Sequence, residues 1–533
     1  MKNGINKILV SLFIFSIAFS NSGSAQIFNE DMYKFGKAIH FIDNQYIDSV
    51  DRAELVEKAI KRVVEDLDPH TVYLTKEEVQ EMNESLEGNF EGIGIEFNIH
   101  NDTIYVISPI SGGPSEKVGI QAGDRIVEID GENVAGIDIS TNGVRDRLLG
   151  EKGTKVNVSI KRPGVEKLLE FTIVRDKIPI HSLDASYITE NNHGYIKLNR
   201  FAQTTHKEFS EAVDDLRQEG MESLILDLRG NGGGYLDQAI KLADEFLEEG
   251  KLLVYTEGRN VERENNYSTK KGKLEKENII ILLDEGSASA SEIVAGAVQD
   301  WDRGMILGRR SFGKGLVQRP VSLPDGSMIR LTIARYHTPT GRVIQKPYNN
   351  DKEEYAKELL DRYNKGEMIS ADSINFPDSL QYKTKELNRV VYGGGGIMPD
   401  IFMPLDTNRY SDIFDDFVRQ GILNAFVINY IDQNREEFKE KYENFPEFKK
   451  DFEVDKEIVK ELINYAEKEG IEVKDEELEE GKDDLKLHIK ALIARDMWDM
   501  SEYFQIVNQH DRIYKKAVEI LDNWEQYESQ YLK

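Results

Sequence analysis

The sequence contains no cysteine among its 533 residues. This absence excludes disulfide bonds, thiol nucleophiles and cysteine-ligated zinc sites. No other group of residues has the ligand spacing of a zinc site either. We therefore expect the protein's chemistry to require no metal ion and no other cofactor.

Positive charge is scarce as well. The chain has 68 lysines and arginines against 97 acidic residues, which gives a net charge of −29. Nucleic-acid binding requires a basic face, so this composition argues against a nucleic-acid partner. The apolar content of 39% supports hydrophobic cores, and the length allows about three or four domains.

Only one long apolar run is present. Ile8–Phe19 comprises twelve residues, which is shorter than the roughly 20 residues that span a bilayer. It follows Lys2 and Lys7 and is followed by small residues before Gln26, as in a secretory signal peptide. We expect residues 1–25 to be a cleaved signal peptide and the protein to be periplasmic or otherwise exported. If the signal stayed uncleaved, it would associate the protein with a membrane.

A serine-rich stretch follows an apolar run in the middle of the chain. Ile279–Leu283 predicts a buried strand, and apolar residues after Ser289 recur with helical spacing. The segment between them, Gly286–Ile293, has the sequence Gly-Ser-Ala-Ser-Ala-Ser-Glu-Ile. A hydroxyl at such a strand-to-helix turn is exposed in the positive field of the helix N-terminus, where a nucleophile could act. The alternative is that Ser289-x-x-Glu292 is only a capping box.

A lysine between two glycines follows Ser289 by 25 residues. Ser311–Gln318 has the sequence Ser-Phe-Gly-Lys-Gly-Leu-Val-Gln, in which the lysine is Lys314. A lysine acts as a general base when burial lowers its pKa towards neutrality, and the amide of Gln318 could orient its amine. The alternative is a surface lysine in a turn. His337 is the histidine nearest in sequence to these segments, so a serine–histidine pair stays open as a second arrangement.

The same lysine lies in a partial match to a phosphate-binding loop. Residues 308–314 fit the motif Gly-x-x-x-x-Gly-Lys, but Gly315 follows where Ser or Thr should stand. Leu316 and Val317 then predict a strand, whereas the motif requires a helix whose N-terminus holds the phosphate. Both departures disfavour nucleotide binding.

Residues 87–176 resemble a PDZ domain. The specific part is the run from Gly119 to Gly131, and an earlier loop resembles the carboxylate-binding loop of such a domain. That loop consists of Gly92, Ile93, Gly94 and Ile95. Successive glycine-rich N–H groups form an anion site, and an adjoining strand edge can accept an extended peptide. We therefore expect peptide binding there; the alternative is that the glycines only form a tight turn.

A second glycine cluster follows another predicted strand. Residues 223–228 are largely apolar and lead directly into Arg229–Gly234, after which the chain is helical again. Bare N–H groups at such a turn can approach a developing negative charge and stabilise an oxyanion. Glycine clusters more often mark close packing, so the turn alone does not decide its role.

With the serine, lysine and glycine segments in view, the chain resembles the carboxyl-terminal processing peptidases, also called tail-specific proteases. The likeness covers residues 28–404, and the 25-residue separation of serine and lysine fits that family. The resemblance implies an α/β, crotonase-like peptidase core with an inserted, β-rich PDZ domain. A helical C-terminal region lies outside the likeness.

The resemblance also implies roles for individual residues. Ser289, the middle serine of its run, would be the nucleophile, Lys314 the general base and Gln318 the partner that orients the lysine. The N–H groups of Ala290 and Gly233 would form the oxyanion hole. The glycine turn has Asn-Gly-Gly-Gly where the family commonly has Asn-Pro-Gly-Gly, so its other glycines stay candidates as well.

We expect six segments along the chain. In order they are a signal peptide (1–25), an N-terminal helical region (26–86), a PDZ domain (87–176), the serine peptidase core (177–350), an insertion with the end of the core (351–404) and an acidic helical C-terminal region (405–533). The apolar residues of the N-terminal helices that are expected on core faces are Phe35, Ile39, Phe41, Ile42, Leu55, Ile60, Val63 and Val64. His70, beside a proline, is expected to be a turn residue and no ligand.

These observations predict an exported serine endopeptidase that cleaves proteins near their C-termini through a Ser289–Lys314 dyad. Its PDZ domain would bind the free C-termini of polypeptide substrates, and an adaptor protein is a further partner that such a domain allows. The principal alternative is a catalytically inactive PDZ adaptor on a protease scaffold. The presence of Ser289, Lys314 and Gln318 argues against it, because an inactive scaffold need not keep them.

Overall fold

The computed structural model describes residues 30–532, apart from 101, 111, 163, 271, 349–351, 407–410 and 472. The expected signal peptide, residues 1–25, lies outside the described residues. The chain divides into two units, residues 1–66 and 67–533, and each is described by itself below. No described helix combines the length and the apolar character needed to cross a membrane.

The first unit contains two helices, α1 (Glu30–Gln45) and α2 (Arg52–Glu65). Helices are predicted here correctly, and Val64 of α2 is buried as expected, but the prediction that Phe35, Phe41 and Ile42 lie on core faces is wrong. Phe35 and Phe41 are each 45% exposed, Ile42 is 39% exposed, and no residue of α1 is buried. Two helices can bury only the narrow line along which they touch, so much of an apolar stripe stays in solvent.

The second unit begins with a short strand that the sequence pattern does not predict. β1 (Val72–Leu74) lies inside the segment 26–86, which is predicted to be helical. Its residues pair antiparallel with β18 (Met328–His337), more than 250 residues away. A strand of three residues is too short for a periodic pattern, so only its distant partner reveals it.

The core of the second unit contains a six-stranded sheet. Its order is β10 (Leu183–Ile188), β11 (His193–Leu198), β12 (Ser223–Asp227), β15 (Asn278–Leu283), β16 (Met305–Gly308) and β21 (Ile401–Phe402). β10 is antiparallel to β11, and the other neighbours are parallel. Buried parallel strands are continuous apolar runs, which is why the sequence predicts β12 and β15 correctly.

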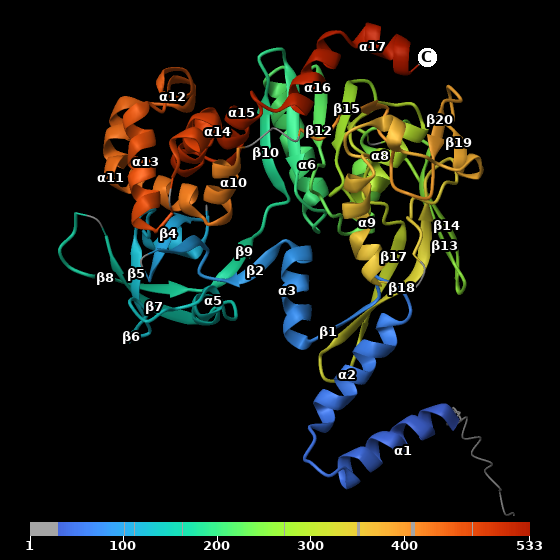
Figure 1. Ribbon diagram of the computed structural model, residues 1–533, viewed down its shortest axis with the longest axis horizontal. Coiled ribbons are helices and arrows are strands. Elements are labelled where there is room, and N and C mark those ends of the chain that lie inside the picture. The colour runs from blue at the N-terminus through green and yellow to red at the C-terminus, as the bar shows by residue number, and fades with distance from the viewer. Residues whose placement is uncertain are drawn as a thin grey trace, which may run out of the picture. The chain divides into compact units, whose positions relative to one another are not determined.

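Helices cover both faces of this sheet. On one face are α6 (Thr205–Gln218), α7 (Leu236–Asp244) and α8 (Ala290–Asp300); on the other are α16 (Arg512–Asp522) and α17 (Trp524–Tyr531). Side chains alternate along a strand, so Leu224 and Leu226 pack with the first group and Ile225 with the second. The last two helices of the chain thus belong to the peptidase core, although the sequence places them in a separate C-terminal region (Figure 1).

A second sheet contributes to the same core. Its order is β1, β18, β13 (Leu252–Gly258) and β14 (Val261–Tyr267), and β17 (Leu316–Ser322) also pairs with β18. β17 begins two residues after Lys314. The strand predicted there is correct, and it leaves no helix N-terminus to hold a phosphate.

The part of the chain that resembles a PDZ domain is β-rich and has its own hydrophobic core. Its sheet has the order β3 (Ile95–His100), β4 (Thr103–Pro109), β5 (Arg125–Ile129), β7 (Lys155–Lys161) and β8 (Leu169–Val174), with β6 (Glu132–Asn133) on β5 and the helices α4 (Pro114–Val118) and α5 (Thr141–Leu148). β2 (Asn89–Gly92) and β9 (Asp176–Pro179) pair where the chain enters and leaves the domain. β3 is an edge strand, so one of its sides is open to a further strand.

An insertion and a helical region complete the unit. The insertion contains α9 (Lys352–Asn364), two short 3₁₀ turns (Ala371–Ser373 and Asp378–Leu380) and the hairpin of β19 (Gln381–Lys383) and β20 (Val390–Tyr392). The helical region contains α10 (Asp412–Arg419), α11 (Ile422–Lys441), α12 (Phe445–Asp451), α13 (Lys456–Lys468), α14 (Asp475–Met497) and α15 (Met500–Val507). These six helices share a separate, aromatic-rich core.

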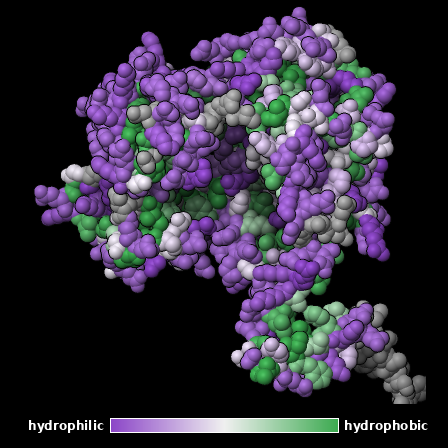
Figure 2. Space-filling view, viewed as in Figure 1, coloured by the Kyte–Doolittle hydropathy of each residue, from purple (hydrophilic) through white to green (hydrophobic). Residues whose placement is uncertain are grey.

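The helical region contacts both the PDZ domain and the peptidase core. Asp432 of α11 forms a 2.7 Å ion pair with Arg125 of β5. Asn508, just after α15, donates a 2.8 Å hydrogen bond from Nδ2 to the Tyr187 hydroxyl of β10. In Figure 1 the helices lie beside β4 and β5 on one side and β10 on the other. Figure 2 shows hydrophilic side chains over most of the visible face, in keeping with the net charge of −29.

Candidate active site

Ser289 lies where β15 turns into α8, as the sequence predicts. Its φ of +54° and ψ of −109° form a backbone conformation that non-glycine residues rarely adopt. Such strain persists only where surrounding contacts enforce it, and it is common at functional sites. Ser289 is half-buried at the N-terminus of α8, in the positive field of the helix.

The carboxylate of Glu292 joins this turn to the lysine segment. It accepts hydrogen bonds from the Ser289 N–H at 2.8 Å and from the Ser311 hydroxyl at 2.5 Å. It also accepts bonds from the N–H groups of Gly313 and Lys314, at 2.7 and 2.8 Å. Glu292 is completely buried, and burial raises its pKa. The capping-box interpretation is therefore incomplete, because the same glutamate connects two segments that are distant in sequence.

Lys314 has the perturbed pKa that a general base requires. Burial and, second, the charge of Arg330 lower its pKa to about 8, against the opposing effects of Glu292 and Asp68. An ordinary lysine has a pKa of about 10.4, so a much larger fraction of this one is neutral near pH 7. Only the neutral amine can accept a proton. The alternative of an exposed lysine in a turn is wrong, because the side chain is half-buried and lines a cleft.

The glycines beside Lys314 allow other backbone segments to approach it. Gly313 has a φ of +88°, and a Cβ there would lie 3.0 Å from the nitrogen of Gly396. The N–H of Gly315 donates a 2.9 Å hydrogen bond to Oε1 of Gln345. The lysine is thus fixed by backbone contacts on both sides.

Tyr336 of β18 completes the connection between serine and lysine. Its hydroxyl donates to the carbonyl oxygen of Lys314 and lies 3.1 Å from the carbonyl oxygen of Ser289. The next residue, His337, stacks on the ring of Tyr255 with a centroid distance of 4.4 Å. Tyr336 lines the cleft that contains Ser289, whereas His337 is not among the described residues that line it. This geometry disfavours the serine–histidine arrangement.

A cleft of 760 Å³ brings the sequence-predicted residues together. Its lining includes Ser289, Ala290, Lys314, Gln318 and Gly233. Apolar side chains from several elements line it as well, beside polar and charged ones such as Asp237, Glu264 and Arg330. The apolar side chains are Leu236, Ile240, Ile293, Leu316 and Val317, with Met82 and Leu86 from α3 (Lys76–Glu87). The cleft therefore offers an apolar surface beside the serine and the lysine.

Gln318 connects the cleft to His70, which the sequence interprets only as a turn residue. Nε2 of Gln318 donates to the carbonyl oxygen of His70 at 2.6 Å. Nε2 of His70 lies 2.7 Å from the Tyr355 hydroxyl. Burial and, second, the charge of Lys314 lower the pKa of His70 to about 4, so its ring is neutral near pH 7. No motif marks His70, because its partners are 248 and 285 residues away.

The glycine turn after β12 packs directly on Ser289. Gly233 has a φ of +99°, and a Cβ there would lie 2.8 Å from Cβ of Ser289. The Gly233 N–H donates to Oδ1 of Asn231 at 2.9 Å. Among the described residues the N–H of Ala290 has no acceptor. Ala290 thus presents an unused donor beside Ser289, whereas the donor of Gly233 is engaged.

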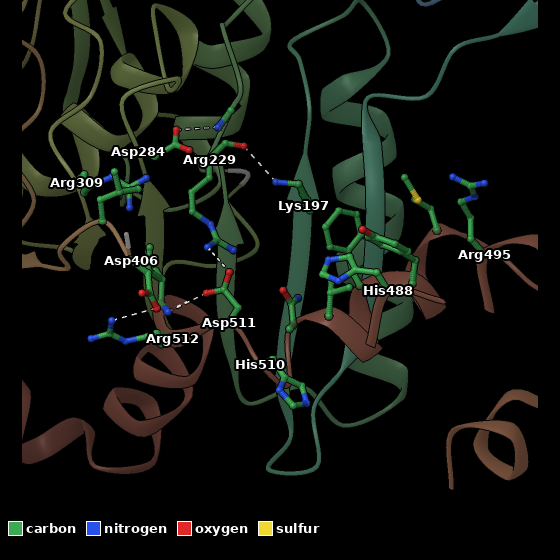
Figure 3. Close-up of a pocket in the computed structure, with 18 of the residues that line it drawn as sticks. Lys197, Arg229, Asp284, Arg309, Asp406, His488, Arg495, His510, Asp511 and Arg512 are labelled. Carbon is green, nitrogen blue, oxygen red and sulfur yellow. Dashed lines mark hydrogen bonds and ion pairs between the residues drawn. The ribbon is translucent and has the colours of Figure 1, made fainter. Parts of the chain in front are cut away.

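Arg229 at the start of this turn is held by the end of the chain. Its guanidinium forms ion pairs with Asp227 of β12 at 2.6 Å and with Asp511, just before α16, at 2.9 Å. Its carbonyl oxygen accepts a 3.2 Å hydrogen bond from Lys197. Figure 3 shows Arg229 directed at Asp511 across a cavity of 570 Å³, with Lys197 on its other side. The sequence gives no indication of Asp511, which lies outside the resemblance.

The PDZ domain has a groove at the predicted loop. A cavity of 350 Å³ is lined by Ile93, Gly94 and Ile95, by Phe97 of β3 and by Leu148 of α5. Residues of α3 and one arginine also line it. They are Glu81, Glu84 and Ser85, with Arg145.

The described residues provide no acceptor for the N–H groups of Ile93 and Gly94. These two donors suit a carboxylate. Gly92 is not part of the lining; it ends β2 opposite Asp176.

The fold and these two sites define a serine peptidase that carries a PDZ domain. Residues 192–352 match Peptidase family S41, residues 92–173 match the PDZ domain, residues 16–78 match the Activating protease CtpB N-terminal domain and residues 413–499 match a family of unknown function. The chain is 40% identical over 321 residues to the carboxy-terminal-processing protease of Bartonella bacilliformis, which covers 59% of this chain and 73% of that protein. The chain belongs to this family of carboxy-terminal processing proteases.

Two further proteins are similar to this chain in sequence. The chain is 37% identical over 318 residues to the carboxy-terminal processing protease CtpB of Bacillus subtilis, which covers 59% of this chain and 66% of that protein. The solved structure of a photosystem II D1 C-terminal processing protease is 29% identical and covers 60% of this chain and 91% of that one. The TM-score of this comparison is 0.34.

We expect Asp511→Asn to lower kcat for peptide hydrolysis by roughly 10-fold, the effect of about 1.4 kcal/mol. Oδ1 of Asp511 also caps α16 through the N–H groups of Ile513 and Tyr514. An asparagine can keep this cap while it removes the charge that pairs with Arg229. Steady-state kinetics and a urea unfolding curve separate the two effects.

Asp522→Asn is the matched control. Asp522, also on α16, lies 2.9 Å from Nε2 of His193, which is at the other end of the same strands. This variant should unfold at slightly lower urea concentration but keep its kcat. If Asp511→Asn changes stability alone, the ion pair with Arg229 has no influence on the glycine turn.

Proposed function

We propose that this protein is an exported endopeptidase that cleaves substrate proteins near their C-termini through a Ser289–Lys314 dyad. The observation that carries the proposal is the lowered pKa of Lys314 in the same cleft as the strained Ser289. A serine beside a neutral lysine is an activated nucleophile. Burial of Lys314 and the charge of Arg330 favour its neutral form.

The proposed reaction proceeds through an acyl-enzyme. Neutral Lys314 removes the proton of the Ser289 hydroxyl while the oxygen attacks the substrate carbonyl, so a tetrahedral oxyanion forms. The lysine then gives this proton to the leaving amine, the peptide bond breaks, and an ester on Ser289 remains. Lys314 next accepts a proton from water, which attacks the ester and releases the new C-terminus. The proton returns to the serine oxygen.

Two N–H groups are proposed for the oxyanion hole. The Ala290 N–H is unused and lies at the N-terminus of α8, so it can donate to a negative oxygen without losing another bond. The Gly233 N–H would be the second donor, and it would exchange its bond to Asn231 for one to the oxyanion. A bond to a charged oxygen is stronger than one to a neutral amide, which favours this exchange in the transition state.

Gln318 is proposed to orient Lys314. Its Nε2 donates to the His70 carbonyl, which fixes the amide and leaves Oε1 as an acceptor for the lysine amine. The neutral ring of His70 adds no competing positive charge.

Either Ser289→Ala or Lys314→Ala should lower kcat/KM on an unstructured polypeptide by roughly 10⁴-fold. The double variant should be little worse than each single one, because residues that act as a unit fail together. In the unmodified protein kcat/KM should rise with pH through a midpoint near pH 8, since Lys314 must lose its proton and its pKa is about 8. A rate-versus-pH series measures both.

Lys241→Ala, an exposed lysine on α7, and His337→Ala serve as controls and should keep full activity. If activity survives in Lys314→Ala but is lost in His337→Ala, the general base is His337 and not Lys314. No turnover by the unmodified protein, together with binding of peptide, would favour the alternative of an inactive PDZ adaptor.

The PDZ groove is proposed to bind the substrate's C-terminus. The unused N–H groups of Ile93 and Gly94 would hold the carboxylate, the edge of β3 would pair with the extended peptide, and Ile95 and Phe97 would contact an apolar terminal side chain. Arg145 in the same groove adds a positive charge. Its ion pair with Glu84 of α3 is long, at 4.0 Å, so a carboxylate could displace it.

Amidation of a long peptide's C-terminus should lower kcat/KM by roughly 10-fold to 100-fold, because a charge-assisted hydrogen bond contributes about 1.5–3 kcal/mol. Ile95→Asp should remove most of this discrimination, since a second negative charge in the groove repels the carboxylate. Ile137→Asp, a 49% exposed isoleucine of the same domain, should leave it unchanged. Equal cleavage of both peptides by the unmodified protein would exclude the PDZ groove from substrate selection.

Export is proposed from the sequence of residues 1–25, since the chemistry above does not depend on the compartment. N-terminal sequencing of the protein from a bacterial periplasmic fraction should begin at Gln26. Recovery only from the cytoplasm, with the first 25 residues still attached, would contradict export.

A further inference from the structure

Arg330 lines the same cleft as Ser289 and Lys314. It lies on β18, where it pairs with Val72 of β1 on one side and Pro320 of β17 on the other. Strands on both sides fix its backbone, and its side chain is half-buried. Its charge is close enough to lower the pKa values of Lys314 and His70. The guanidinium is therefore near the reacting groups.

No carboxylate among the described residues pairs with this guanidinium. Its one side-chain contact there is from Nη1 to Sδ of Met82 at 3.9 Å, and its Nε is buried without a hydrogen-bond partner. Burial also lowers the pKa of Arg330. A charge withdrawn from water without a partner costs free energy, so such a group in a native structure requires an explanation.

Several other buried or half-buried arginines of the protein are paired with carboxylates. Arg309 forms two hydrogen bonds with Glu285, at 2.6 and 3.1 Å, and Arg389 forms ion pairs with Asp302 and Asp400. In a chain with 97 acidic residues such partners are abundant. Half-buried arginines without a carboxylate, such as Arg303, donate to backbone carbonyl oxygens instead. Arg330 differs from them because no oxygen among the described residues accepts a hydrogen bond from its guanidinium.

The nearby carboxylate of Asp68 is already occupied. It accepts hydrogen bonds from the Thr71 hydroxyl at 2.5 Å and from the His70 N–H at 2.7 Å. The hydroxyl of Thr332, two residues after Arg330, lies 3.2 Å from it. Asp68 is thus directed at its own turn, and the donors of Arg330 remain available to a ligand.

We propose that Arg330 binds a carboxylate group of the substrate within the catalytic cleft. A planar guanidinium can hold a carboxylate with two parallel hydrogen bonds, which gives direction as well as attraction. The carboxylate would be the side chain of an acidic residue near the scissile bond or the chain's own terminal carboxylate when the cut lies a few residues from the end. The inference rests on the proposed peptidase function, because it specifies the substrate of the same cleft.

Two pairs of peptides distinguish the two sources. The first pair is amidated at the C-terminus and differs only by Glu or Gln beside the scissile bond. The second pair contains no acidic residue and ends a few residues after that bond, with a free or an amidated terminus. The quantity measured is the ratio of kcat/KM within each pair, because a ratio cancels any change in the reactivity of Lys314.

We expect the unmodified protein to prefer the charged member of at least one pair by roughly 10-fold. Arg330→Met should reduce the ratio of the first pair to about one and that of the second pair to the part that the PDZ groove contributes, whereas Arg330→Lys, which keeps the charge but not the paired donors, should retain part of the difference. Any contribution of the PDZ groove to the second pair persists in these variants. A further result is expected in Arg330→Met: the midpoint of the pH profile should move upward, because one of the charges that lower the pKa of Lys314 is gone.

Arg335→Met is the matched control, since Arg335 is an exposed arginine of the same strand and does not line the cleft. It should keep both the ratio and the pH profile. A ratio near one for both pairs in the unmodified protein, or a ratio that Arg330→Met leaves unchanged, would overturn the inference. If Arg330→Met does not fold, a kcat/KM ratio that is unchanged in Arg330→Lys would likewise overturn the inference. Hydrolysis that still depends on Ser289 would uphold the proposed function in each of these cases.

Discussion

The geometry of the active site depends on one buried carboxylate. Glu292 accepts hydrogen bonds from both the serine turn and the lysine segment, and it has no contact with solvent. A buried charge is tolerated only if its lone pairs are satisfied, so this residue forces the two segments to stay together. Tyr336 reinforces the arrangement through the carbonyl oxygens of Ser289 and Lys314. The strained backbone of Ser289 is maintained by these contacts.

The cleft is lined by segments that are distant from one another in sequence. The lysine is followed by β17, the glycine turn follows β12, and α3 and β1 come from the segment before the PDZ domain. The C-terminal helices add Asp511 to the far side of the glycine turn and cover a face of the main sheet. The low pKa of Lys314 thus depends on segments that are distant in sequence, because these segments bury its side chain.

Local patterns predict those features whose causes are local. The strands β12 and β15 are unbroken apolar runs, the helix after Ser289 has its capping pattern beside it, and the glycines mark the tight turns. His70 could not be found in this way, since it reaches Gln318 only through the pairing of β1 with the distant β18. Nothing local marks Arg330 either, because its lack of a carboxylate partner is a property of the folded chain. An amphipathic pattern predicts that one face of a helix is buried, but it does not identify the element against which that face packs. The sequence pattern therefore predicts incorrectly that α16 belongs to a separate helical region, although it packs on the main sheet. It also predicts incorrectly that the apolar residues of α1 are buried.

Helix α3 has a consequence for how the two sites relate. Glu81, Glu84 and Ser85 line the PDZ groove, whereas Met82, Asn83 and Leu86 line the catalytic cleft. A helix of 12 residues is only about 18 Å long and moves as a rigid rod. α3 therefore forms a wall of both the PDZ groove and the catalytic cleft, so a tilt of this helix that widens the groove narrows the cleft. If a peptide bound in the groove displaces α3, it changes the affinity of the cleft for its own peptide. Thermodynamic reciprocity then requires that a peptide in the cleft changes the affinity of the groove by the same factor.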